Sequence, residues 1–182
     1  MVLPIYLYGK PVLKFKGQDI QSDYEGLQKL IADMWETMYF AKGVGLAAPQ
    51  IGLAIRLFVV DSTAYYEKED ALKGIKKVFI NAQILEETGK IWGFEEGCLS
   101  IPKLNAEVNR PSNLKIRYFD EHFQEHTEVY DDMNARIIQH EYDHIEGILF
   151  IDKISPIRRK ILQKKLDKIR NGLVSTSYPV KA

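Results

Sequence analysis

The sequence predicts an α+β fold, in which small mixed or antiparallel sheets surround a central helix and a further helix lies toward each end of the chain. Three segments repeat their apolar residues with helical spacing: one in the first quarter of the chain, and two in the last third. Between the first and the second of them, short runs rich in β-branched and aromatic residues indicate strands. The order of one helix, several strands and then helices is typical of α+β domains.

Length and composition indicate one domain over residues 1–182, with a mass of 21.0 kDa. No apolar run approaches the roughly 18 residues of a membrane span, and Met1–Tyr6 lacks the features of a secretory signal. The 25 basic residues balance 25 acidic ones, which argues against a broad nucleic-acid surface. The single cysteine, Cys98, excludes an internal disulfide. We therefore expect a cytoplasmic enzyme or binding module.

The first helix is expected to open at Ser22–Asp23, because Ser22 and Glu25 have the spacing of a capping box. Its apolar residues recur at Leu27, Leu30, Ile31, Met34, Trp35 and Met38. Lys42–Gly43 should close it, since a cation suits the last turn and glycine readily takes a positive φ.

The middle of the chain reads as strands and turns. The expected strands are Ile55–Val60, Val78–Ala82 and Leu114–Tyr118, and a turn at Asp120–His122 leads to a partner strand near Thr127–Tyr130. Gly89, Gly93 and Gly97 predict turns or close backbone approach rather than long regular elements.

Two helices follow. Asp131 or Asp132 should cap the first, which carries Met133, Ile137, Ile138 and Ile145 and ends near Glu146–Gly147. Ser155–Pro156 starts the second as an N-cap followed by proline at the first helical position, and Asn171–Gly172 stops it.

The last helix has two contrasting faces. Its apolar stripe is Ile157, Ile161, Leu162, Leu166 and Ile169, and its basic residues are Arg158, Arg159, Lys160, Lys164, Lys165, Lys168 and Arg170. The basic face is interpreted as a solvated surface, with RNA or a ribosome-like partner as the alternative.

The sharpest local motif is Gln139–His144, which reads His-Glu-x-x-His from His140. On a helix, residues four apart lie on one face, so His140 and His144 can bind a single cation, with Glu141 close by as a proton shuttle. The alternative is a pair of surface or core histidines.

His122 and His126 are also four apart, but they lie at a predicted hairpin, where four residues span roughly 13 Å. We therefore interpret them as exposed loop residues.

A catalytic site of this type usually takes three protein ligands and leaves one position for water. The candidates for the third ligand are Cys98, Asp143 and a carboxylate elsewhere in the chain. A lone cysteine is commonly a buried apolar residue, but here a thiolate would complete a set of one sulfur and two nitrogens. Asp143 could instead support a neighbouring ligand.

Gly43–Gln50 is rich in small residues, which allow a backbone to run close to a ligand. It fails as a phosphate loop, because no Gly-Lys-Ser/Thr follows it. Together, however, Gly43–Gln50, Glu96–Ser100 and Gln139–His144 resemble the three signature motifs of peptide deformylases, in the same order. The resemblance extends from the strand-like Pro4–Leu13 to the basic terminal helix.

The resemblance implies a role for each matching residue. Cys98, His140 and His144 would hold a divalent metal, with water as the fourth ligand. In this family the metal is generally Fe(II), and Ni, Co and Zn can substitute; one sulfur and two nitrogens suit several first-row ions. Glu141 would pass the water's proton to the leaving amine.

The same resemblance assigns the side-chain amide of Gln50 and the backbone N–H of Leu99 as donors to the developing oxyanion. The substrate would be the N-formyl-methionyl end of a nascent peptide, bound as an extended strand beside Val44–Leu46, with the Gly45 backbone on the formyl end.

The family's pocket for the methionine side chain maps to Met133, Arg136 and Ile137. Arg136 is unexpected in an apolar pocket, so its stem should fold inward with the guanidinium in water. Asn105 stands where family members often carry a peptide-binding arginine, a departure that bears on peptide affinity. Glu96 and Arg110 would support the metal ligands from behind.

Pro156–Asn171 resembles the deformylase subgroup that ends in a helix, whose basic face can dock at the ribosome. We expect a monomer with no membrane contact. Two rival hypotheses are a His-Glu-x-x-His endopeptidase, and a binding module with a structural metal on Cys98, His140 and His144.

Overall fold

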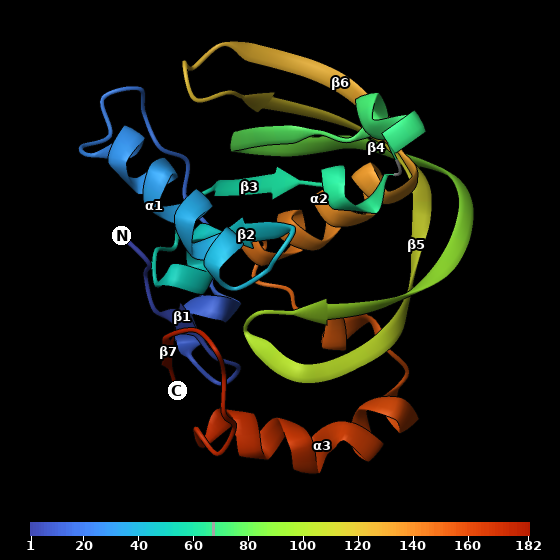
Figure 1. Cartoon of the computed structure of the whole chain (residues 1–182). Coiled ribbons are helices and arrows are strands. Elements are labelled where there is room, and N and C mark those ends of the chain that lie inside the picture. Colours follow the sequence, from blue (N-terminus) through green and yellow to red (C-terminus); the bar gives the residue numbers. More distant parts are fainter. Residues whose placement is uncertain (67) are drawn as a thin grey trace.

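The structure is a computed structural model that describes residues 1–66 and 68–182, and it confirms the α+β class (Figure 1). The main sheet is antiparallel, with five strands in the order β2-β3-β4-β5-β6. Its strands are β2 (Gly45–Ala47), β3 (Leu57–Asp61), β4 (Lys76–Cys98), β5 (Ile101–Phe119) and β6 (Glu125–Asp131). A second, parallel pair joins β1 (Ile5–Tyr6) to β7 (Val180–Lys181), so the two ends of the chain lie side by side.

The long hairpin of β4 and β5 is the feature that the sequence analysis missed. We expected turns at three glycines, yet all three lie inside β4, a strand of 23 residues. Register shifts such as the one between Thr88 and Ile91 bend the hairpin, and Gly89 takes a φ of +83°. The expected close approach is confirmed at Gly97, where a Cβ would lie 2.4 Å from Asn105 Oδ1. Bulges bend a long strand without ending it, so Gly89 and Gly97 mark register shifts instead of turns, whereas Gly93 pairs regularly with Asn109.

Helix α2 (Asp132–Ile145) lies inside the curve of this hairpin (Figure 1). Ala135, Ile138 and Ile145 are fully buried in it and pack in one core with Phe58 and Phe79 of the sheet. The helix is buried on its polar side as well, where Arg136, Glu141 and His144 are enclosed with the apolar residues. The central helix that the sequence predicted is therefore held on the inner surface of the sheet.

Helix α1 (Leu27–Phe40) begins later than expected. Its N-cap is Gly26 in the left-handed region, and no side-chain cap is formed, so the predicted capping box of Ser22 and Glu25 is wrong. At the other end Lys42, rather than Gly43, has the positive φ, at 58°. Gly43 instead sits close to a neighbouring side chain: a Cβ there would lie 2.9 Å from Leu99 Cδ1, so the leucine would have to shift.

Helix α3 (Pro156–Arg170) begins as predicted, with the Ser155 side chain accepting a hydrogen bond from the Arg158 N–H. Its apolar stripe is only partly buried: Leu166 is fully buried, whereas Ile157 is 76% exposed. The helix is not the last element, because the chain turns back after it and pairs as β7 with β1. The expectation that the chain ends in this helix is therefore wrong.

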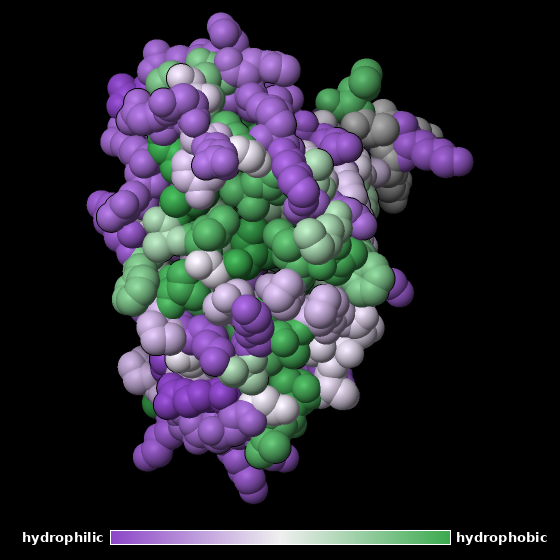
Figure 2. Space-filling model, turned by 90° about the vertical axis from the view of Figure 1, so that its left-hand side faces the viewer, coloured by the Kyte–Doolittle hydropathy of each residue, from purple (hydrophilic) through white to green (hydrophobic). Residues whose placement is uncertain are grey.

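Figure 2 shows the side of the molecule that carries α1 and the chain termini, where apolar side chains form a band between more polar regions. Across residues 1–66 and 68–182, the structure contains no helix with both the length and the apolar character needed to cross a membrane.

One carboxylate at the surface, that of Asp152, ties the last helix to the rest of the fold. Asp152 accepts hydrogen bonds from the Lys14 side chain at 2.5 Å, the Leu149 N–H at 2.9 Å and the Arg159 side chain at 2.7 Å. Burial opposes the charged form, but these donors outweigh it and lower the pKa of Asp152 below its ordinary value. The stabilisation is therefore present above the unfolded-state pKa of about 3.9 and is lost as the pH falls through the lower folded-state value.

We predict that Asp152→Asn lowers the free energy of unfolding by about 1–2 kcal/mol at pH 7. The control is Asp167→Asn, since Asp167 lies on α3 and accepts a hydrogen bond from Gln163. Urea unfolding near pH 7 and near pH 3 should show the gap between wild type and Asp152→Asn closing in acid; a gap of the same size at both pH values would contradict the assignment.

Candidate active site

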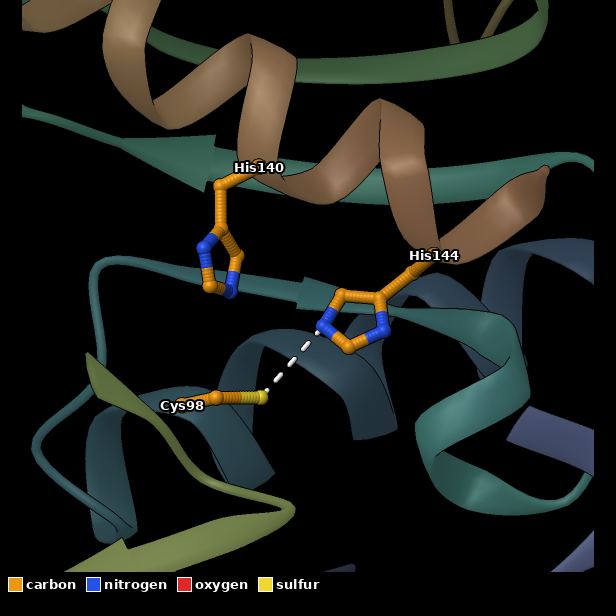
Figure 3. Close-up of side chains that lie close together, drawn as sticks. All are labelled: Cys98, His140 and His144. Carbon is orange, nitrogen blue, oxygen red and sulfur yellow. Dashed lines mark hydrogen bonds between the residues drawn. The ribbon is translucent and has the colours of Figure 1, made fainter. Parts of the chain in front are cut away.

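Cys98, His140 and His144 converge on one point, as Figure 3 shows. Their candidate ligand atoms all lie within 4.8 Å of one another, and Cys98 Sγ is 3.4 Å from His144 Nε2. The two histidines project from the same face of α2, and Cys98 ends β4 just before a tight turn to Ile101. Of the candidates for a third ligand, the structure therefore places Cys98 beside the histidines.

The surroundings of this cluster favour a cation. Burial disfavours the charged form of His140, but Cys98 and Glu96 outweigh it and hold the pKa of His140 well above its ordinary value. Burial, with the nearby charges of His140 and Arg110, lowers the pKa of His144 well below its ordinary value, which keeps it in the neutral form that binds metals. A thiolate and two imidazole nitrogens are ligands that first-row divalent ions accept, so the residues fit a metal.

Glu96 supports His140 from behind the ligand group. Its carboxylate lies 2.9 Å from His140 Nδ1, which leaves Nε2 for the cation. Arg110 donates to both Glu96 oxygens, at 2.7 and 3.0 Å, and to Asp143 at 2.8 Å. A carboxylate bonded to the far nitrogen of a ligand histidine orients the ring. The structure thus places Glu96 and Arg110 behind the ligands and gives Asp143 a supporting position rather than a ligand position.

Arg136 does not place its guanidinium in water, and this expectation was wrong. The residue is 2% exposed, and its guanidinium donates to Glu96 at 2.8 Å and to the carbonyl oxygens of Val108 and Trp92, at 2.7 Å each. It also lies 4.4 Å from the centre of the Trp92 ring. A guanidinium with an anion, two carbonyls and an aromatic face is stable when buried. Arg136 therefore forms part of the cavity wall with its charge buried.

Glu141 is a buried carboxyl group without full hydrogen bonding. Its Oε2 has no partner within the described part of the chain. Burial raises the pKa of Glu141 to about 7; His140 and Arg110 partly oppose the shift, and Glu96 adds to it. A carboxyl group whose pKa lies close to neutrality is suited to both accepting and returning a proton.

Gly45 explains how the first motif meets this carboxyl group. A Cβ at Gly45 would lie 2.5 Å from Glu141 Oε1, so only glycine lets β2 pass so close. Val44 and Gly45 both line the cavity in front of the cluster. The structure therefore brings the glycine-rich segment and the His-Glu-x-x-His helix into direct contact.

Gln50 is oriented by its neighbours. Its Oε1 accepts the Ala47 N–H at 2.9 Å, so its Nε2 faces Cys98 Sγ at 3.5 Å and Ser100 Oγ at 3.2 Å. The side chain is 1% exposed and cannot easily reorient. Leu99 occupies the turn after Cys98, where it lines the same cavity.

The cavity has a volume of about 690 Å³. Its lining includes every expected pocket residue, namely Val44, Gly45, Met133, Arg136 and Ile137. It also includes residues that sequence reasoning missed: Tyr65, Phe94 and the stretch Ser175–Tyr178. Phe94 could have been found if Phe94, Glu96 and Cys98 had been read as alternate positions of one strand.

His122 and His126, which we expected to be exposed loop residues, differ in position. His126 lies in β6 and contacts Asp120 at 2.7 Å, whereas His122 is exposed in the preceding turn. Among the described residues, the pair forms no candidate metal group. The hairpin is confirmed, but only His122 is a turn residue. Asn105 lies opposite Gly97 across the β4–β5 hairpin.

Known proteins share both this sequence and this fold. A family model described as "Polypeptide deformylase" matches residues 2–160. The chain is 49% identical to the peptide deformylase of Christiangramia forsetii over 188 aligned positions, covering 100% of this chain and 96% of the relative. It is 50% identical to that of Flavobacterium psychrophilum, with 100% and 97% covered.

Solved structures give the same result. The peptide deformylase of Thermus thermophilus superposes with a TM-score of 0.83 at 37% identity, over 94% of this chain and 99% of the other. That of Legionella pneumophila gives 0.82 at 35% identity, over 95% and 98%. The candidate metal ligands, the buried carboxyl group and the full-length similarity all agree. The chain therefore belongs to the polypeptide deformylase family, the metal-dependent hydrolases that remove formyl groups from the N-termini of nascent polypeptides.

Proposed function

We propose that this chain, acting as one catalytic domain over residues 1–182, hydrolyses the formyl amide of N-formyl-methionyl nascent peptides with Glu141 as its proton-transfer group. The observation that carries the proposal is the meeting of three groups in one cavity: a sulfur and two imidazoles, a buried carboxyl group with an unpartnered oxygen, and the amide of Gln50. Each group has a part in hydrolysing an amide: the metal ligands in activating water, the carboxyl group in proton transfer, and the amide in stabilising the oxyanion.

Cys98, His140 and His144 would hold the metal. A divalent ion there lowers the pKa of water and so supplies a hydroxide-like nucleophile near neutral pH. Glu141, whose pKa is about 7, accepts the proton of the attacking water and returns it to the leaving amine. The Nε2 of Gln50 and the N–H of Leu99 donate to the oxygen on which negative charge grows. Donors of this kind are each worth about 3 kcal/mol in comparable sites.

The substrate backbone is proposed to extend the main sheet. β2 is an edge strand whose one neighbour is β3, and Val44 and Gly45 line the cavity. An extended peptide can add to such an edge through main-chain hydrogen bonds. Met133 and Ile137, buried on α2, then offer an apolar wall for the methionine side chain.

We propose Fe(II) as the resident metal, with Ni, Co or Zn as possible substitutes. Support comes from the mixed donor set, since the softer thiolate suits first-row ions and excludes Mg²⁺ and Ca²⁺, which prefer oxygen. A thiolate that lines an open cavity should also make the iron form sensitive to oxygen.

The two rival functions are less well supported. A structural metal site is normally closed by four protein ligands, and across the described residues the candidate group has three. A His-Glu-x-x-His endopeptidase would share Glu141, but the cysteine ligand and the amide of Gln50 aimed at it favour formyl hydrolysis.

The partners proposed are the nascent chain and, through α3, the ribosome. Arg158, Lys160, Lys164, Lys165 and Lys168 are exposed on α3, which supports electrostatic contact with a polyanion. We propose a cytoplasmic location, because formylated nascent chains are made there. We also propose a monomer, because one chain supplies all the residues named in the site.

We predict that Glu141→Gln keeps the metal but lowers kcat by roughly 10²–10⁴, because proton transfer is lost while the ligands remain. The assay is formate release from formyl-Met-Ala-Ser by ferrous-loaded protein, with metal content measured in parallel. Glu125→Gln on exposed β6 is the control, with wild-type activity expected. Loss of metal by Glu141→Gln would refute its assigned role, and absence of formate release by the wild type, or cleavage of casein instead, would refute the proposed activity.

We predict that protein prepared without oxygen carries about one iron per chain and that air removes its activity, because the thiolate and Fe(II) both oxidise. Elemental analysis before and after exposure measures this, and reloading with nickel should restore turnover. Cys98→Ala should bind no stoichiometric metal. Zinc as the main metal in the anaerobic preparation would contradict the iron assignment.

We predict that Lys164→Glu with Lys168→Glu weakens co-sedimentation with ribosomes at low salt by at least about tenfold, while formate release from the tripeptide stays unchanged. The control replaces two exposed lysines outside α3, as Lys68→Glu with Lys90→Glu. Equal weakening by both double variants would show that net charge, not α3, determines the contact.

A further inference from the structure

After α3 the chain returns to the cavity of the active site. It turns back at Gly172, with a φ of +70°, and runs as a C-terminal strap, residues 173–179, to the strand pair of β7 with β1. Ser175, Thr176, Ser177 and Tyr178 line the same cavity as Cys98 and Glu141. The strap lies outside residues 2–160, the region that the family model matches.

The strap is held in place at both ends. The Ile5 N–H donates to the Pro179 carbonyl at 2.9 Å, and the Lys103 side chain donates to Ser175 Oγ at 2.9 Å. Between these points the burial alternates, with Thr176 and Tyr178 half-buried and Ser175 and Ser177 exposed. The backbone bends at Ser177 and Tyr178, and the Tyr178 ring packs against a buried apolar cluster, so Tyr178 faces the protein.

Tyr178 reaches the turn that carries Leu99. Its hydroxyl donates to the Leu99 carbonyl oxygen at 2.7 Å. Burial raises the pKa of Tyr178 to about 12, with a further contribution from the Cys98 charge, so the hydroxyl remains a donor at neutral pH. Both side chains also pack against one apolar core, beside Met38 and Leu46.

The other hydrogen bonds that hold the turn from Cys98 to Ile101 fall on Ser100 and not on Leu99. The next carbonyl, that of Ser100, accepts the Tyr8 N–H at 2.8 Å, and Ser100 Oγ accepts Gln50 Nε2 at 3.2 Å. The Leu99 carbonyl is therefore held by the strap, while the Ser100 carbonyl is held by the N-terminal segment. Fixing the peptide group that follows Leu99 limits rotation of the residue whose own N–H is the proposed oxyanion donor.

We propose that Tyr178 is a positioning residue for deformylation, which acts through the C-terminal strap to hold the Leu99 turn in its reactive geometry. This rests on the proposed function, because it takes the Leu99 N–H as a donor to the oxyanion. An interaction that matters only when charge develops on the substrate affects kcat, not substrate binding. The hydroxyl should therefore change kcat and leave KM for the peptide nearly constant.

The test is Tyr178→Phe in the full chain, which removes one hydroxyl and keeps the ring in its core. The matched control is Tyr8→Phe, because the Tyr8 hydroxyl contacts Arg170 and only its backbone N–H holds the turn. Formate release from formyl-Met-Ala-Ser should show kcat three- to tenfold lower for Tyr178→Phe, the equivalent of roughly one hydrogen bond, with KM within about twofold. Tyr8→Phe should match the wild type.

A second readout is independent of activity. In zinc-loaded protein, amide hydrogen exchange at Leu99 and Ser100 should quicken by a similar factor in Tyr178→Phe and not in Tyr8→Phe. Unchanged kcat and exchange, a rise in KM alone, or equal effects of the two variants would overturn the proposal. If the wild type released no formate, the proposed function would fail, and exchange would still decide whether the hydroxyl holds the turn.

Discussion

The site depends on one buried carboxylate, that of Glu96, which joins its own strand β4 to β5 and α2. It accepts two hydrogen bonds from Arg110 on β5, one from Arg136 on α2, and contacts His140 on the same helix. Burial penalises its charge, but His140 and Arg110 outweigh the penalty and lower the pKa of Glu96 far below its ordinary value. Removing one member of such a group leaves buried charges without partners, which costs several kcal/mol. The carboxylate therefore fixes the hairpin, the helix and the histidine together.

Curvature of the β4–β5 hairpin makes this arrangement possible. A flat hairpin would present its face to one side of a helix, whereas the bulged hairpin encloses α2 (Figure 1). The end of β4 then reaches the helix face that carries His140 and His144. Because the same bend brings Cys98 to the histidines and Glu96 behind them, metal binding and the fold are supported by the same residues.

Features set by neighbouring residues could be predicted from the sequence, whereas contacts between residues far apart in the chain could not. The four-residue spacing of His140 and His144 and the Ser155 cap are set within one helical turn, so they could be predicted directly. Cys98 lies 46 residues from His144; the residues alone made it one of several candidates for the third ligand, and the resemblance to a family then selected it. Arg136 was misread because its partner Glu96 is 40 residues away, and Tyr178 was missed because it contacts Leu99 across 79 residues. No periodicity encodes such contacts; they arise from the bend of a hairpin and the return of a chain end.

The coordination of the loaded metal tests the central claim most directly. X-ray absorption spectroscopy of the protein, loaded with one zinc or one iron per chain, resolves sulfur from nitrogen in the ligand shell. We expect one sulfur at about 2.3 Å and two imidazole nitrogens at about 2.0–2.1 Å in the zinc form, with the remaining position filled by solvent oxygen. A shell without sulfur, or one completed by a fourth protein side chain, would contradict the convergence of Cys98, His140 and His144 on a shared, open metal site.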